Sequence, residues 1–162
     1  LFNQCRDMSI EHLTDIQRAA RYFFLIKESF GSRMNSFRTG AFDLQKSIDY
    51  LLEVQKRLKN VLIENLDFER LIQIYDRENT LFYLDPPYYG TERYYEEKFS
   101  AGDHERLKSC LDTVNGKFIL SYNDCPYIRA LYRDYDLREV SRMNSLSSEN
   151  RTGYKELLIK NY

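Results

Sequence analysis

Apolar residues recur at helical spacing through the first third of the chain. Between residues 11 and 29 they fall on one helical face, which predicts an amphipathic helix. Residues 30–42 form a predicted loop, because Gly31 and Gly40 interrupt the pattern and mostly polar residues lie between them. Residues 44–59 predict a second amphipathic helix. The pattern therefore indicates a helical first domain over residues 1–60.

From residue 61 onward the pattern alternates between strands and helices. Asp67 and Asp103 are placed to cap helices, and Pro126 is placed to begin a short one. The predicted strands are residues 61–64, 80–84, 117–122, 136–141 and 154–160. The last two have no helical segment between them, so they are predicted to pair antiparallel.

The fold class that follows is α/β. Residues 80–84 are continuously apolar, as expected for a strand covered on both faces of a parallel sheet. We therefore expect a mostly parallel sheet with a C-terminal antiparallel hairpin over residues 61–162. Ligands bind such sheets at the carboxyl ends of the strands. Residues 85–88 follow one strand, and Asn123 and Asp124 follow the next.

Length and charge limit the classes of protein that fit. The 162 residues, 43% hydrophobic and 30% charged, are typical of a soluble globular domain. No apolar run approaches the roughly 20 residues of a membrane span. The formal net charge of −1 is unlike that of a strong nonspecific nucleic-acid binder. The chain does not begin with Met, so we expect it to be a piece of a longer protein.

Cysteine and histidine provide no sign of a metal centre. The 3 cysteines are scattered, and none has metal-ligand or redox spacing to another. His12 and His104 fall in polar surroundings at predicted helix starts, without a neighbouring Cys or His. We expect no metal, no membrane and a reducing, cytoplasmic setting.

The most specific chemical signal is Asp85-Pro86-Pro87-Tyr88, directly after the predicted strand at residues 80–84. Two adjacent prolines cannot continue a central strand or enter a helix interior. The chain therefore makes a rigid corner that holds a carboxylate, free carbonyls and an aromatic ring. The plain alternative is a structural turn.

This corner suits methylation of an exocyclic amine such as adenine N6. The nitrogen lone pair is delocalised into the ring, so hydrogen-bond acceptors on both N–H bonds would favour a nucleophilic nitrogen. Asp85 and the carbonyl of Pro86 can accept those bonds, while Tyr88 can stack on the base. Methyl transfer then needs mainly positioning and electrostatics, with the base turned out of the duplex.

Asp85-Pro86-Pro87-Tyr88 resembles the catalytic motif of the Dam-like N6-adenine DNA methyltransferases. Further segments resemble the same family: a helical target-recognition segment, an acidic-aromatic turn, the strand that follows the motif, and a terminal hairpin. These are residues 18–42, 65–68, 118–123 and 145–162. The resemblance implies a partial Rossmann-like methyltransferase sheet, S-adenosylmethionine as cofactor and double-stranded DNA as partner, with a possible cognate restriction enzyme.

The resemblance also implies roles for single residues. Asp85 would lie by the methyl donor and the target amine, and Pro86, Pro87 and Tyr88 would form the base pocket. Asp67 would lie near the cofactor adenine, with simple helix capping as its alternative role.

Five further residues are candidates for contact with DNA, and solvated surface is the alternative for each. Arg and Asn read guanine and adenine edges. The candidates for this kind of contact are Arg33, Asn35 and Arg38, whereas Asn150 and Arg151, at the tip of the terminal hairpin, are candidates for phosphate contact.

The aromatic loop at residues 89–99 is predicted to close as a lid over the base, using Tyr89, Tyr94, Tyr95 and Phe99. The alternative is that its aromatic rings pack on the core.

The sequence departs from the family at two places. The glycine-rich cofactor loop is absent, since the 6 glycines are isolated, so the chain looks like the C-terminal portion of a methyltransferase. The loop at residues 30–38 differs from the Dam type, so a GATC target is not carried over. Two alternatives stay open: an amine methyltransferase acting on cytosine N4, RNA or a protein amide, and a non-catalytic DNA-binding remnant.

Overall fold

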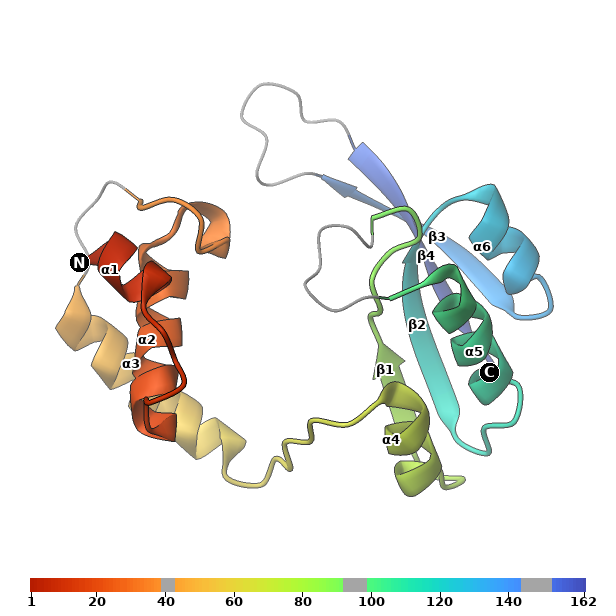
Figure 1. Cartoon of the computed structure of the whole chain (residues 1–162). Coiled ribbons are helices and arrows are strands. Elements are labelled where there is room, and N and C mark those ends of the chain that lie inside the picture. Colours follow the sequence, from red (N-terminus) through yellow and green to blue (C-terminus); the bar gives the residue numbers. More distant parts are fainter. Residues whose placement is uncertain (39–42, 92–98, 144–152) are drawn as a thin grey trace. The chain divides into compact units, whose positions relative to one another are not determined.

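The computed structural model describes residues 1–38, 43–91, 99–143 and 153–162 (Figure 1). The chain divides into two compact units, Leu1–Leu62 and Ile63–Tyr162. Each unit is described by itself.

The first unit is helical over most of its length. It contains α1 (Phe2–Asp7), α2 (Asp15–Glu28), the short 3₁₀ turn η1 (Phe30–Ser32) and α3 (Leu44–Leu58). The two long helices confirm the periodic pattern, whereas α1 is too short to show one. Helix α2 begins later than expected because Thr14 and Gln17 form a capping box, in which the Thr14 side chain accepts from the Gln17 N–H at 3.3 Å.

Side chains tie α1 to α2. The Arg21 guanidinium donates to the carbonyls of Cys5 and Arg6, at 2.5 and 2.7 Å. The Phe2 ring is buried, and its centroid lies 6.4 Å from that of Phe24. The bonds from Arg21 satisfy carbonyl groups that have no partner within α1. They stabilise a helix of six residues, which would be too short to be stable alone.

The predicted strand at residues 61–64 was wrong. The segment between α3 and α4 has no regular structure, and Leu62 and Ile63 are 71% and 76% exposed. A strand needs a neighbour that pairs its backbone groups, and none of the strands in the described ranges pairs with this segment. The apolar run was therefore not sufficient to make a strand.

The second unit is a four-stranded sheet with helices. Its elements are α4 (Phe68–Tyr75), β1 (Leu81–Leu84), α5 (Ala101–Leu111), β2 (Lys117–Asn123), α6 (Pro126–Leu131), β3 (Asp136–Met143) and β4 (Gly153–Lys160). The strand order is β1-β2-β4-β3. The antiparallel pairing of β3 with β4 is confirmed. The expectation of a mostly parallel sheet was wrong for the described strands, because β1 and β2 are parallel and the other pairs are antiparallel.

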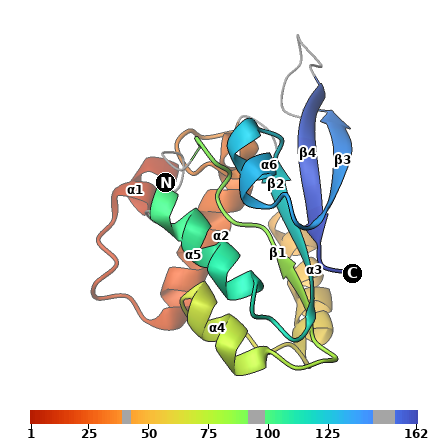
Figure 2. The ribbon, with the colours of Figure 1, turned by 90° about the vertical axis from the view of Figure 1, so that its right-hand side faces the viewer.

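The core lies on one face of this sheet. Helices α4 and α5 lie next to each other beside the strands (Figure 2). Their apolar residues and those of α6 pack on alternate residues of β1, β2 and β4, including the fully buried Phe118, Leu120 and Ile159.

Strand β1 was expected to be covered on both faces, and this was wrong. Phe82 is buried in the core, but Leu81 and Tyr83 are 58% and 68% exposed. Successive side chains of a strand point to opposite faces, and the described helices cover the face of Phe82.

The start of α5 also differs from the expectation that Asp103 is its cap. Ser100 caps the helix, and Asp103 is the third helical residue, whose carboxylate accepts from the Ser100 N–H at 2.7 Å. This is a capping box, in which the acid lies one turn inside the helix.

Candidate active site

The corner at residues 85–88 leaves the carboxyl end of β1. The Asp85 carboxylate is exposed, and its Oδ1 accepts a hydrogen bond of 2.8 Å from the hydroxyl of Ser121. Ser121 lies on β2 and is 3% exposed. Because β1 and β2 are parallel, their carboxyl ends lie at the same edge, which allows a β2 side chain to orient Asp85.

Tyr88 reaches further across the sheet. Its hydroxyl donates to Oε1 of Glu156 at 3.0 Å, and Glu156 lies on β4, on the far side of β2 from β1. The Tyr88 ring is half-buried, with its centroid 6.2 Å from that of Tyr122. Burial, followed by the bond to Glu156, raises the pKa of Tyr88. The phenol therefore stays protonated and acts as a donor.

The next residue, Tyr89, is held by other elements. Its carbonyl accepts from Nδ2 of Asn123 at 3.1 Å, at the end of β2. Its ring stacks on Tyr127 with centroids 4.2 Å apart, and meets His104 edge-on at 5.4 Å. Asn123 was predicted at this edge, and the structure places it there.

His104 was expected in polar surroundings, and this was wrong. It is fully buried, with Nδ1 2.7 Å from the Tyr122 hydroxyl. Its ring also meets Phe99 edge-on at 4.8 Å. His104 shares the buried face of α5 with Leu107 and Leu111, and this helical spacing was the signal that the sequence contained.

The same imidazole thus contacts Tyr89 and Phe99, the two described aromatic residues of the predicted lid. These two rings pack on the core of the second unit, as the alternative interpretation expected. Tyr94 and Tyr95 lie outside the described residues, and the lid stays a prediction.

A cleft of about 630 Å³ opens beside the corner. Asp85, Pro86 and Pro87 form one part of its wall, and residues 65–68 form another. Asp103 and Arg106 of α5 also line it. The structure therefore brings Asp67 and Asp85, which are far apart in the sequence, to one cleft.

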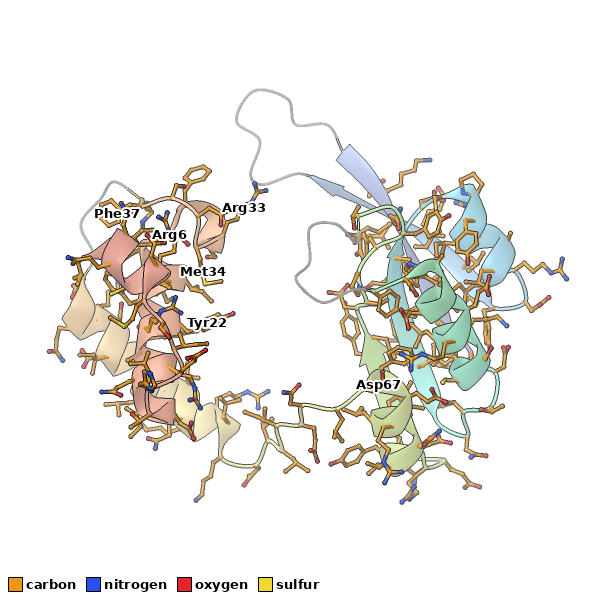
Figure 3. The ribbon with its side chains drawn as sticks, in the orientation of Figure 1. Arg6, Tyr22, Arg33, Met34, Phe37 and Asp67 are labelled. Carbon is orange, nitrogen blue, oxygen red and sulfur yellow. The ribbon has the colours of Figure 1, made fainter. Side chains whose placement is uncertain are left out.

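Asp67 caps α4, which is the helix-capping role predicted for it as the alternative to cofactor contact (Figure 3). Its Oδ1 accepts from the Glu69 N–H at 3.0 Å, and its two oxygens accept from the Arg106 guanidinium at 2.9 and 3.3 Å. The bond to Asp67 is the main cause that raises the pKa of Arg106. Arg106 also lies 4.2 Å from the centre of the Phe68 ring, so Asp67 is held in a fixed orientation at the wall of the cleft.

Three of the candidate DNA contacts lie on one loop of the first unit. Arg33, Asn35 and Arg38 are all exposed. A β-bridge between Ser29 and Phe37 closes the loop at its base. Figure 3 marks Arg33 and Phe37 on this loop.

The loop itself is tightly turned. Gly31, Ser32 and Met34 have positive φ angles of 60°, 57° and 58°. The Arg6 guanidinium supports it by donating to the Asn35 carbonyl at 3.1 Å. Asn150 and Arg151, the remaining candidates, lie outside the described residues.

The described part of the chain contains no group of three or more His, Cys, Asp or Glu side chains that could hold a metal ion. None of its helices has the length and apolar character needed to cross a membrane.

Residues 8–146 match the profile of the D12 class N6 adenine-specific DNA methyltransferases. This range includes the loop of the first unit, the corner and the cleft. The chain belongs to this family.

Three curated relatives of this D12-class chain are type II methyltransferases. M1.LlaDCHI of Lactococcus lactis subsp. cremoris is 27% identical over 97% of the chain and 63% of its own length. M.MjaIII of Methanocaldococcus jannaschii is 30% identical over 91% of the chain and 58% of its own length. M.CviBI of Paramecium bursaria Chlorella virus NC1A is 22% identical over 99% of the chain and 66% of its own length. The D12-class chain therefore spans 58% to 66% of the length of these relatives.

Proposed function

We propose that the chain is part of a site-specific DNA methyltransferase that transfers a methyl group from S-adenosylmethionine to adenine N6. The observation that carries the proposal is the Asp85 carboxylate, held by Ser121 at the carboxyl edge of the sheet and open to the cleft. Family membership supports the same reaction.

The corner supplies the acceptors that an exocyclic amine needs. Ser121 bonds to Oδ1 of Asp85, which leaves Oδ2 free to accept one N–H of the amine. The carbonyl of Pro86, which accepts from no group in the described ranges, takes the other N–H. With both N–H bonds engaged, the nitrogen lone pair is drawn out of conjugation and directed at the methyl donor. Asp85 also stabilises the positive charge that develops on this nitrogen.

Tyr88 provides a surface for the base itself. Adenine must leave the duplex to reach the corner, and a flipped base loses its stacking with neighbouring bases. An aromatic ring restores part of that stacking, at about 1–3 kcal/mol per base. The Tyr88 ring is half-buried next to the acceptors, which suits this role.

The residues of the cleft fit part of an S-adenosylmethionine site. Carboxylates of Asp67, Asp85 and Asp103 match the cationic and hydroxyl groups of the cofactor, and Phe68 and Phe99 match its adenine. When bound, the cofactor supplies an electrophilic methyl group on a sulfonium. The chain contains no glycine-rich loop, so we assign only this half of the site to its residues.

The first unit is proposed to recognise double-stranded DNA through Arg33, Asn35 and Arg38. Their exposure on one closed loop supports this assignment, because side chains that read base edges must project from the surface. Asn150 and Arg151 are proposed as phosphate contacts. The names of the type II relatives support a cognate restriction enzyme in the same system. We place the reaction in the cytoplasm, where the three free cysteines would stay reduced.

Labelled S-adenosylmethionine tests the proposal. The whole protein, of which this chain is a part, is incubated with unmethylated duplex DNA, and the DNA is then digested to nucleosides. We expect label in N6-methyladenine. Label in N4-methylcytosine would replace adenine as the target, and label only in an RNA substrate would replace DNA. DNA binding without transfer would favour the non-catalytic alternative.

A further inference from the structure

We propose that Glu156 is a positioning residue, whose buried carboxylate holds the Tyr88 ring in place for stacking on the target base. The inference rests on the proposed function and extends it to a residue outside the motif. It starts from the hydrogen bond of 3.0 Å between the Tyr88 hydroxyl and Oε1 of Glu156.

The position of Glu156 is an unusual one for a carboxylate. It lies on β4 and is 5% exposed, while Leu157 and Ile159 of the same strand belong to the apolar core. Burying an ionised carboxylate is unfavourable unless hydrogen bonds compensate, and well-packed apolar residues often stabilise such positions better. The bond to Tyr88 offsets part of this cost and gives the carboxylate a role at the corner.

The hydrogen bond to Glu156 fixes the orientation of the Tyr88 ring, which packing alone does not. A half-buried ring can rotate about its side-chain bonds, and stacking requires one orientation. Tyr88 is bound at its hydroxyl by Glu156, and its ring makes a tilted contact with Tyr122, so both the hydroxyl and the ring are held. At the other end of the motif, Ser121 holds Asp85. The two bonds bracket Pro86 and Pro87, so the sheet orients the acceptors and the ring together.

The pairing of β2 with β4 places a second hydrogen bond to the corner next to the one from Glu156. Glu156 pairs directly with Asn123, whose Nδ2 holds the Tyr89 carbonyl at 3.1 Å. Neighbouring positions on β2 and β4 thus hold consecutive residues of the corner. Glu156 does not line the cleft that contains Asp67 and Asp85, so it should affect the base and not the cofactor.

The test uses the whole protein of which this chain is a part. It compares methyl transfer to unmethylated plasmid DNA by wild type and by Glu156→Leu, Glu156→Gln and Tyr88→Phe. We expect Glu156→Leu and Tyr88→Phe each to lower kcat roughly tenfold, the scale of one hydrogen bond to a charged group. The KM for S-adenosylmethionine should stay unchanged. Glu156→Gln keeps an acceptor oxygen, so it should retain most of the wild-type kcat.

The double variant Tyr88→Phe/Glu156→Leu separates positioning from a general structural role. If the two residues act through one bond, the double variant should be no slower than either single variant. Urea denaturation of each variant checks folding, and Glu78→Gln, an exposed glutamate before β1, is the matched control.

Two results would overturn the inference: a folded Glu156→Leu protein with wild-type kcat, or single effects that multiply in the double variant. If Glu156→Leu does not fold, the other two variants still test the role of Glu156. Glu156→Gln must then keep most of the wild-type kcat, and Tyr88→Phe must be slower than wild type. An inactive wild-type whole protein would instead refute the proposed function, and this inference with it.

Discussion

Replacing His104 by Ala should destabilise the second unit by about 4 kcal/mol. The ring is fully buried, and it contacts Tyr89, Phe99 and Tyr122. Truncating a large buried side chain to Ala costs about 2–5 kcal/mol through lost contacts and the cavity left behind. Loss of the hydrogen bond to the Tyr122 hydroxyl adds about 1–3 kcal/mol. We take about 4 kcal/mol because these contributions overlap at one site.

His104→Phe separates the two contributions. It keeps an aromatic ring against Tyr89 and Phe99 but has no nitrogen for the Tyr122 hydroxyl. We therefore expect it to cost about 1–2 kcal/mol, at most half the effect of Ala. His12→Ala is the control, since His12 is exposed in the first unit, and it should change stability by less than about 0.5 kcal/mol.

Urea denaturation at pH 7 measures these differences. The near-ultraviolet circular dichroism of the buried Tyr122 and Tyr132 reports on the second unit. Because His104 contacts the rings of Tyr89 and Phe99, chymotrypsin should also cleave after these two residues faster in His104→Ala than in wild type. A His104→Ala loss below about 1 kcal/mol, or a Phe variant as unstable as Ala, would refute the reasoning.

Three further predictions concern other positions. Gly116→Ala should destabilise the second unit by about 1–3 kcal/mol in urea denaturation, because a Cβ there would lie 2.7 Å from the Thr80 carbonyl oxygen. Asp76→Ala should destabilise the second unit at pH 7 and much less near pH 2. Hydrogen bonds, the largest from the backbone N–H of Asn115, lower the pKa of Asp76 in the folded state. The Asp76 carboxylate therefore stabilises the fold above its unfolded pKa of about 3.9, and this stabilisation is lost as pH falls through the folded pKa. An equal loss at both pH values would contradict this. Arg106→Ala should weaken the binding of S-adenosylmethionine roughly fivefold, as measured by calorimetry, because the Asp67 carboxylate loses its bidentate partner. An unchanged affinity would argue against Asp67 in the cofactor site.

Local signals predicted local structure well. The cap at Asp67, the proline that begins α6 and the final antiparallel pair all depend on neighbouring residues, and each is confirmed. Residues 61–64 carry the same apolar character as a strand, but no described strand pairs with them. A pairing partner is a property of the whole fold, which a four-residue pattern does not contain.

In the candidate site, too, the residues of a local motif were predicted from the sequence, whereas their partners on other strands were not. Asp85 and Tyr88 stand out because prolines separate them, and that signal is contained in four consecutive residues. Their partners Ser121 and Glu156 come from β2 and β4, and Glu156 meets Tyr88 only because β4 pairs with β2 in the order β1-β2-β4. His104 was missed because its polar neighbours outweighed the apolar spacing of α5.

The most direct measurement of the central claim is the rate of N6-methyladenine formation in duplex DNA by the whole protein, of which this chain is a part, as wild type and as Asp85→Ala. Removing one preorganised electrostatic group from a reacting centre costs about 100-fold or more. Asp134→Asn, at an exposed carboxylate of the second unit, is the control and should keep the wild-type rate. We predict a loss of about 100-fold in Asp85→Ala with its fold intact. An undiminished rate in that variant would contradict the account.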